Sequence, residues 1–264
     1  MLVFFLAAVV FTANQGGAMK MTFPHEIGVK AIEVRWENKK IPAFRVNDAW
    51  TTIVGIDLDA KPGEHSAQVM FVMQDGRVDS REATIRIVEK KYPTTELKVE
   101  EKFVQLSAAD QARASRESKE IDTIFSSITN EMLWSNAFTV PIPGRSGANF
   151  GHRRVFNGEP RAPHAGADLR AATGTPIRAT NAGRVVLAKN LFFTGNTVIL
   201  DHGLGIYSLY AHLSRIDVKT GVTMKNGQVV GLAGATGRVT GPHLHWGVRV
   251  QGARVDPFTL VGVN

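Results

Sequence analysis

The sequence predicts a mainly β protein with a small immunoglobulin-like β-sandwich, a helical linker and a C-terminal glycine-rich antiparallel β domain. Three observations support this fold class: apolar alternation before residue 90, helical periodicity after residue 107, and short glycine-separated strands from Phe138 onward. With 264 residues, 44% of them hydrophobic, the chain can bury two cores. We therefore divide it into residues 1–18, an export signal or anchor; 19–92, the β-sandwich; 93–137, the linker with its helix; and 138–264, the glycine-rich domain.

The first of these segments is apolar. Residues 2–11 read LVFFLAAVVF, a run too short to span a bilayer comfortably, and small and polar residues follow it. This pattern is typical of an export signal, although the basic residues that normally precede the apolar run are missing. We expect a trimmed signal or an uncleaved membrane anchor, and a buried strand or helix is the less favoured alternative. The absence of cysteine excludes disulfides and thiolate metal sites.

Residues 19–92 show the two-residue periodicity of strands. Apolar side chains occupy alternate positions from Val69 to Met73 and again from Ala83 to Ile87, and Asp75-Gly76 between these runs favours a tight turn. Earlier runs of similar character are separated by NKKIP and KPGEH. These features favour an antiparallel sandwich of immunoglobulin-like type. No cluster of polar side chains stands out, so we interpret this domain as a binding or spacer module.

The linker is expected to contain one helix. Ser107 precedes Asp110 by three positions, as in a capping box, and the apolar residues beyond them recur at helical spacing. Such a stripe is more often ordinary packing surface than a ligand-binding feature. Its members are Ile121, Ile124, Phe125 and Ile128.

Charge is divided unevenly along the chain. The formal net charge is +7, but from Phe138 onward 14 Lys and Arg stand against 5 Asp and Glu, so this part carries +9 and the remainder −2. A basic exported domain suits an anionic polymer such as cell wall, a phospholipid surface or nucleic acid. A solvated basic surface without a partner is the alternative.

Five residues of the basic domain have the chemistry of a metal site with adjacent catalytic groups. His164 and Asp168 come from PHAGADL, His212 from LYAHLS, and His243 and His245 from GPHLHWG, where a strand would point the last two to one face. A catalytic zinc ion takes three His, Asp or Glu ligands and leaves a position for water, a count that His164, Asp168 and His245 meet. His212 and His243 would supply the proton acceptor and oxyanion donors that amide hydrolysis needs. Scattered structural histidines are the alternative.

Residues 141–258 resemble the lysostaphin-like, or LytM-type, zinc metallopeptidases, which cut peptide bonds in peptidoglycan. The resemblance rests on the His-x-x-x-Asp, Tyr-x-His and His-x-His motifs quoted above, which occur together in one glycine-rich domain. It implies a LytM-type peptidase domain over residues 138–264. It also implies that His164, Asp168 and His245 bind one Zn²⁺ ion and that His212 and His243 are the catalytic pair.

The resemblance further implies an exported zinc metalloendopeptidase that hydrolyses cross-link or stem peptides of peptidoglycan in the periplasm or cell envelope of a Gram-negative bacterium. The alternative is a non-hydrolytic LytM-type protein that binds the wall or activates amidases, but such relatives have lost metal ligands and this chain keeps every one. Nucleic-acid binding is not expected, because few aromatic residues accompany Arg and Lys and because export argues against it. Glycine bridges and direct D-alanine–diamino acid cross-links both stay open as substrates, and the oligomeric state stays unknown.

Overall fold

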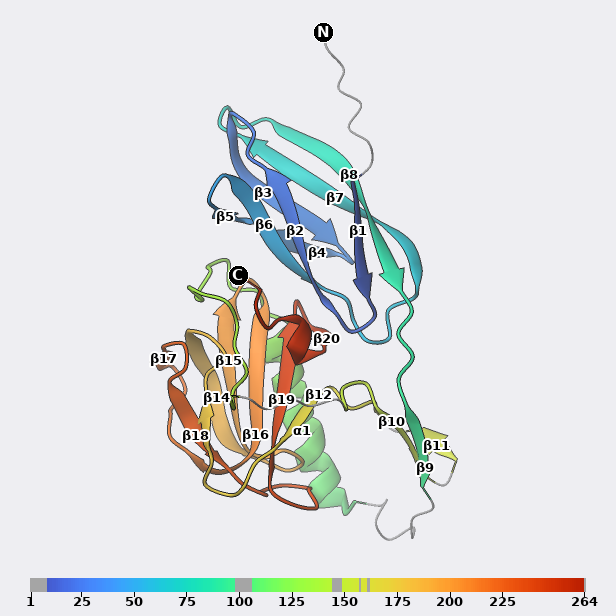
Figure 1. Cartoon of the computed structure of the whole chain (residues 1–264). Coiled ribbons are helices and arrows are strands. Elements are labelled where there is room, and N and C mark those ends of the chain that lie inside the picture. The colour runs from blue at the N-terminus through green and yellow to red at the C-terminus, as the bar shows by residue number, and fades with distance from the viewer. Residues whose placement is uncertain (1–8, 98–105, 144–148, 157, 161, 264) are drawn as a thin grey trace. The chain divides into compact units, whose positions relative to one another are not determined.

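The computed structural model describes residues 9–97, 106–143, 149–156, 158–160 and 162–263 (Figure 1). The chain divides into two compact units, residues 1–90 and 91–264. Strands dominate both units, which confirms the predicted mainly β fold class.

The N-terminal unit is a β-sandwich. Its strands are β1 (Val9–Asn14), β2 (Ala18–Pro24), β3 (Val29–Trp36), β4 (Lys39–Pro42), β5 (Phe44–Val46), β6 (Ala49–Gly55), β7 (Gly63–Met73) and β8 (Val78–Val88). The larger sheet has the order β1-β8-β7-β3-β4 and the smaller sheet the order β2-β6-β5. Side chains from both sheets share one hydrophobic core, in which Met21, Trp36 and Phe71 are buried.

Strands β7 and β8 form the hairpin that the apolar alternation predicted. They pair antiparallel with Val72 opposite Val78, and Gly76 in the intervening turn has a φ of 87°, a conformation that favours glycine. The Asp75 carboxylate accepts hydrogen bonds of 3.0 and 2.7 Å from the backbone N–H and the guanidinium of Arg77. The turn chemistry and the period of two therefore specify the register of this hairpin.

Strand β1 lies in the segment expected to be an export signal or anchor. It pairs in parallel with β8, and its alternate residues Phe11 and Ala13 pack against the sandwich core. Val9–Asn14 thus form a largely exposed strand that packs on the sandwich through alternate side chains, and the export signal or anchor expected over residues 1–18 stays a prediction. Residues 1–8 lie outside the described part of the chain. None of the described helices combines the length and apolar character needed to cross a bilayer.

The C-terminal unit is built on one antiparallel sheet. Its strands are β12 (Gly166–Arg170), β13 (Pro176–Arg178), β14 (Gly183–Leu191), β15 (Gly195–Gly203), β16 (Ile206–Ile216), β17 (Thr223–Met224), β18 (Val229–Ala233), β19 (His243–Val250) and β20 (Ala253–Val255). The main order is β12-β19-β16-β15-β14-β17, while β18 pairs with β13 and β16, and β20 with β19. Strand β19 thus lies between β12 and β16, which places its two histidines inside the sheet.

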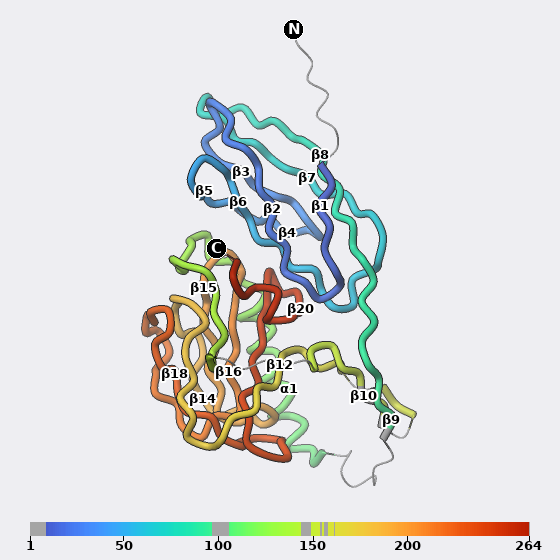
Figure 2. Tube along the Cα trace, viewed as in Figure 1, coloured from blue at the N-terminus to red at the C-terminus, as the bar shows by residue number. Residues whose placement is uncertain are grey.

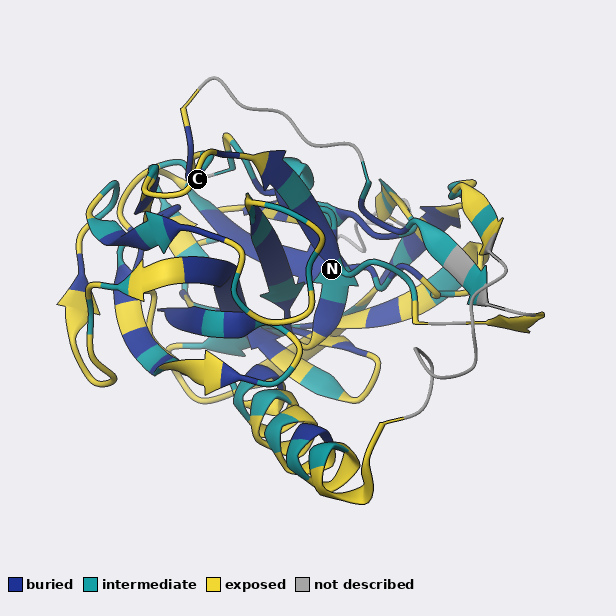
Figure 3. Cartoon of the chain, turned by 90° about the horizontal axis from the view of Figure 1, so that it is seen from below, coloured by how far each residue is buried: buried dark blue, intermediate teal, exposed yellow. Residues whose placement is uncertain are grey.

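Helix α1 (Ala108–Ser126) packs on this sheet (Figure 2). The Ser107 hydroxyl accepts a hydrogen bond of 3.1 Å from the Asp110 N–H, which confirms the predicted N-cap. Ile121, Ile124 and Phe125 contact the apolar side chains of β14, β15 and β16, so the predicted stripe is packing surface. The opposite side of the helix is exposed (Figure 3).

A small second sheet lies beside the segment that leads to β12. It contains β9 (Thr94–Leu97), β10 (Arg153–Phe156) and β11 (Glu159–Pro160), and β10 pairs in parallel with β9. The N–H of Gly151 donates to the His164 carbonyl at 2.8 Å, and the His164 N–H donates to the His152 carbonyl at 3.0 Å. This pairing fixes the backbone of His164 before the main sheet begins.

Candidate functional site

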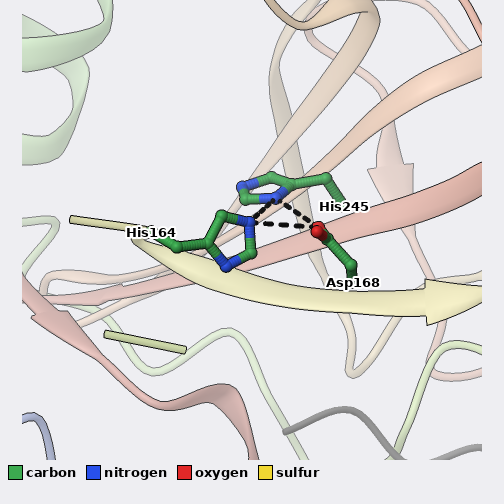
Figure 4. Close-up of side chains that lie close together, drawn as sticks. All are labelled: His164, Asp168 and His245. Atoms are coloured by element: carbon green, nitrogen blue, oxygen red, sulfur yellow. Dashed lines mark hydrogen bonds and ion pairs between the residues drawn. The ribbon is translucent and has the colours of Figure 1, made fainter. Parts of the chain in front are cut away.

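Two neighbouring strands and the segment before them carry the candidate metal ligands. In the antiparallel pair β12 and β19, Asp168 lies directly opposite His245, and directly opposed residues project from the same face of a sheet. His164 lies four residues before Asp168. The three side chains meet at one point although His164 and His245 are 81 residues apart (Figure 4).

The donor atoms of these side chains are close enough to share an ion. His164 Nε2 lies 3.0 Å from His245 Nδ1 and 3.1 Å from Asp168 Oδ1, and His245 Nδ1 lies 2.9 Å from the same oxygen. Tetrahedral zinc with bonds of about 2.0–2.1 Å separates its donors by roughly 3.4 Å, so an expansion of a few tenths of an ångström would admit the ion. Two imidazole nitrogens and one carboxylate oxygen therefore fit zinc in both chemistry and spacing.

Asn149 orients two of the three donors, and the sequence motifs did not reveal it. Its backbone carbonyl lies 3.0 Å from His164 Nδ1, and because a carbonyl can only accept, Nδ1 carries the proton and Nε2 presents its lone pair. Its carboxamide donates to Asp168 Oδ2 at 2.7 Å and accepts from the Asp168 N–H at 2.9 Å. Asn149 lies 19 residues before Asp168, in a loop whose course no periodicity predicts.

His212 reaches the site through an irregular backbone. Its neighbour Ala211 lies opposite His245, so regular alternation would turn His212 to the other face of the sheet. Instead His212 has a φ of 61°, and its ring centre lies 5.9 Å from that of His245. Its N–H donates to the Thr194 carbonyl and its Nδ1 faces the Thr236 carbonyl, both at 2.9 Å. Nε2 is therefore the nitrogen with the free lone pair.

His243 lies next to His212 and shows the same pattern. The two ring centres are 4.8 Å apart. His243 Nδ1 lies 2.9 Å from the Gly241 carbonyl, which again assigns the proton to Nδ1 and the lone pair to Nε2. That Nε2 is 3.6 Å from Asp168 Oδ1. The structure thus brings all five residues singled out in the sequence into one cluster.

Burial and hydrogen bonding set the charge of this cluster. Burial opposes ionisation of Asp168, but the interactions of its carboxylate with the His164 and His245 rings outweigh this effect and hold the pKa of this carboxyl far below its usual range. Burial lowers the pKa of His212 to about 4 and also lowers the pKa of His245. At neutral pH Asp168 is therefore an anionic carboxylate and His212 and His245 are neutral imidazoles, and metal ligands require these protonation states.

The close approach of β12 and β19 depends on Gly166. A Cβ atom at this position would lie 2.6 Å from the Trp246 carbonyl oxygen and 2.8 Å from both Cε1 and Nε2 of His245. The His245 ring therefore occupies the space that any larger residue at position 166 would need.

His202 lies in the core of the same unit and has a structural role. It is fully buried, and its Nδ1 and Nε2 contact the Ala182 carbonyl and the Ser208 hydroxyl, both at 2.7 Å. Burial lowers its pKa to about 4, against smaller opposing effects of the Ala182 hydrogen bond and the Asp201 charge. Of the other histidines, His152 hydrogen-bonds to Thr95 at 2.8 Å, and His25 and His65 belong to the N-terminal unit.

The segment that carries this cluster matches a known family. Residues 162–257 match Peptidase family M23, and they contain all five clustered residues. This segment is an M23 peptidase domain. The match agrees with the LytM-type resemblance found in the sequence, and the ligand and catalytic roles of the individual residues stay predictions.

The M23 domain is similar to parts of curated proteins that are named as peptidases. Peptidoglycan DD-endopeptidase ShyA of Vibrio cholerae is 43% identical over 120 residues, which are 45% of this chain and 28% of that protein. DD-carboxypeptidase/endopeptidase Mpg of Neisseria meningitidis is 40% identical over 97 residues, 37% of this chain and 22% of that protein. The chain thus covers only about a quarter of the length of these relatives.

A solved structure shares the fold over both units. The crystal structure of a chain assigned to peptidase M23 from Pseudomonas aeruginosa is 29% identical, with a TM-score of 0.72, and the match covers 95% of each chain. The N-terminal sandwich therefore accompanies an M23 domain in that protein as well.

Proposed function

We propose that this protein is an exported zinc-dependent endopeptidase that hydrolyses cross-link or stem peptides of bacterial peptidoglycan. The observation that carries the proposal is the convergence of His164 Nε2, Asp168 Oδ1 and His245 Nδ1 within an M23 domain, with two further histidines beside them. The name of ShyA, a peptidoglycan DD-endopeptidase, supports peptidoglycan as the substrate. The basic charge of the same domain suits a polymer that bears carboxylates.

His164, Asp168 and His245 would hold one Zn²⁺ ion. Bound zinc would supply a Lewis acid that polarises the scissile carbonyl and lowers the pKa of water to about 7. Asn149 would keep His164 and Asp168 oriented for this task, since it bonds to both. The donors come from β12, β19 and the segment before β12, so their geometry depends on strand pairing rather than on a single loop.

His212 and His243 would carry out proton transfer. The Nδ1 of each faces a backbone carbonyl, which leaves each Nε2 free to accept a proton from the attacking water. Once protonated, such an Nε2–H can stabilise the negative oxygen of the tetrahedral intermediate or donate to the departing amine. Amide hydrolysis requires one group to accept a proton from the attacking water and one to donate a proton to the departing amine. Two adjacent imidazoles can fill both roles.

Digestion of purified sacculi together with zinc analysis tests the proposal. The wild-type protein should contain stoichiometric zinc and release peptides. His245→Ala should lose both zinc and lysis, His243→Ala should keep zinc and lose lysis, and His65→Ala in the N-terminal unit should keep both. A lytic His243→Ala protein would remove this residue from the mechanism. Zinc binding with attachment to sacculi but no released peptide would instead favour a non-hydrolytic wall-binding regulator.

A further inference from the structure

We propose that Arg170 is a specificity-determining residue that binds a substrate carboxylate located on the carbon atom that bears the scissile amide nitrogen. This inference rests on the endopeptidase function proposed above and narrows its substrate. It predicts the direct cross-link made by a diamino dicarboxylic acid rather than a glycine bridge.

Strand register places Arg170 at the candidate active site. Arg170 follows Asp168 by two positions on β12, so both side chains project from the same face of the sheet. In the pairing of β12 with β19, Arg170 lies directly opposite His243. The Cβ atoms of such a pair are about 4.5–5.5 Å apart. The arginine side chain therefore starts beside one of the two imidazoles assigned to proton transfer.

Arg170 has no partner for its charge within the described part of the chain. The residue is exposed, and no carboxylate or carbonyl among the described residues binds its guanidinium. The nearest acidic side chain along the strand, Asp168, is already engaged through Oδ1 by the two candidate histidine ligands and through Oδ2 by Asn149. The Asp168 carboxylate is thus not available to neutralise Arg170.

Other arginines of this unit are held by their surroundings. Arg215 is paired with Asp217, with a second contact of 3.0 Å. Arg249 donates to the Ala165 carbonyl at 3.2 Å, and the Arg238 guanidinium lies over the Phe193 ring, 4.5 Å from its centre. Arg170 differs because it has no such partner among the described residues, so the planar fork of donors on its guanidinium is available to match a carboxylate with two parallel hydrogen bonds.

The chemistry of the two candidate substrates decides which one offers that carboxylate. In a direct cross-link through a diamino dicarboxylic acid, the carbon that bears the scissile nitrogen also bears a free carboxylate, whose carbon lies about 2.5 Å from that nitrogen. A glycine bridge has no carboxylate at this position. Arg170 lies opposite His243 in the strand pairing. If His243 protonates the departing nitrogen, the carboxylate of the direct cross-link therefore lies within reach of the Arg170 side chain.

The test uses two peptides that differ in one group. Both contain D-alanine joined to a meso-diamino dicarboxylic acid, and the carboxyl group next to the scissile amide is free in one peptide and a carboxamide in the other. We would measure kcat/KM for both, and by calorimetry the Kd of matching non-cleavable analogues in which a methylene replaces the scissile carbonyl. The proteins are the wild type, Arg170→Ala, Arg170→Lys and the control Arg184→Ala, which removes an exposed arginine four strands away on β14.

The wild type and Arg184→Ala should prefer the free carboxylate by about tenfold in kcat/KM and in Kd, the size expected for charge-assisted hydrogen bonds. Arg170→Ala should lose this preference, while its kcat/KM and Kd for the carboxamide ligands should equal those of the wild type. Arg170→Lys should keep part of the preference. An Arg170→Ala protein that keeps the preference, or that weakens both ligands equally, would overturn the inference, as would a wild type that binds neither analogue. An Arg170-dependent preference in Kd without hydrolysis of either peptide would support the role of Arg170 and refute the proposed hydrolase.

Discussion

Replacing Gly166 with alanine tests how strongly the donor geometry depends on the close approach of two strands. The added Cβ would lie 2.6 Å from the Trp246 carbonyl oxygen and 2.8 Å from two atoms of the His245 ring. Ordinary carbon contacts begin near 3.5 Å, so strand and ring must separate by about 0.7 Å or more. The contact with the carbonyl involves backbone on both sides, so a side-chain rotation alone cannot relieve it.

This displacement is large compared with the tolerance of a metal site. Metal–ligand bond lengths vary by only about 0.2 Å around their preferred values, and His245 Nδ1 moves with its ring. Asp168, two residues beyond Gly166 on the same strand, shifts as β12 moves. Loss of such supporting geometry typically lowers metal affinity by about 10-fold to 100-fold. We expect Gly166→Ala to lose zinc affinity by at least this factor and to release correspondingly less peptide from sacculi.

Zinc affinity can be measured by competition with a chromophoric chelator. Gly241→Ala is the matched control, because a Cβ there would meet no atom within 4 Å and the residue does not have a positive φ. Far-ultraviolet circular dichroism and urea denaturation would show whether each variant is folded. A folded Gly166→Ala protein that binds zinc as tightly as the control would refute the steric reasoning.

Three further predictions concern residues outside the ligand set. Asn149→Ala should weaken zinc binding by about 10-fold to 100-fold, measured by the same competition, because the oriented tautomer of His164 and one hydrogen bond to Asp168 lose support; unchanged affinity would contradict the role given to Asn149. Ser107→Ala should lower the free energy of unfolding by about 1 kcal/mol in urea titrations, through loss of the α1 cap, and no change would mean that the cap is dispensable. The pKa of His202 is lowered from 6.5 to about 4 in the folded state, so the unfolded chain binds more protons between these values. Stability should be full above pH 6.5 and fall by up to about 3 kcal/mol as the pH drops towards 4. The fall should be smaller in His202→Gln, and an equal fall in both proteins would show that other groups cause it.

The His-x-His spacing predicted that His243 and His245 share one face, because both lie on a regular strand. His243 and His245 alternate with buried residues on β19, as the period of two requires, and the hairpin of β7 and β8 follows its apolar pattern. The cap of α1 was also visible, since Ser107 and Asp110 interact within one turn of the chain. Strand periodicity and helix-capping preferences, which depend only on residues near one another in the sequence, were enough to predict these elements.

The remaining features depend on tertiary contacts that no local rule contains. Alternation would turn His212 away from His245. Its hydrogen bonds to the Thr194 and Thr236 carbonyls hold it in the left-handed conformation that turns it towards His245. Asn149 acts through a carboxamide that meets Asp168 across a loop. A strand in the first apolar run was the less favoured alternative because no amphipathic pattern surrounds that run, and the pairing of Val9–Asn14 with β8 becomes evident only in the assembled sandwich.

The pairing of β12 with β19 has a consequence for the time at which activity can arise. Asp168 and His245 are 77 residues apart, and β19 follows β12 to β18 along the chain, so it leaves the ribosome after all of them. A growing chain that ends before β19 has neither His243 nor His245, however well its earlier strands have folded. The proposed hydrolase would therefore stay inactive until β19 has been synthesised and has paired with β12.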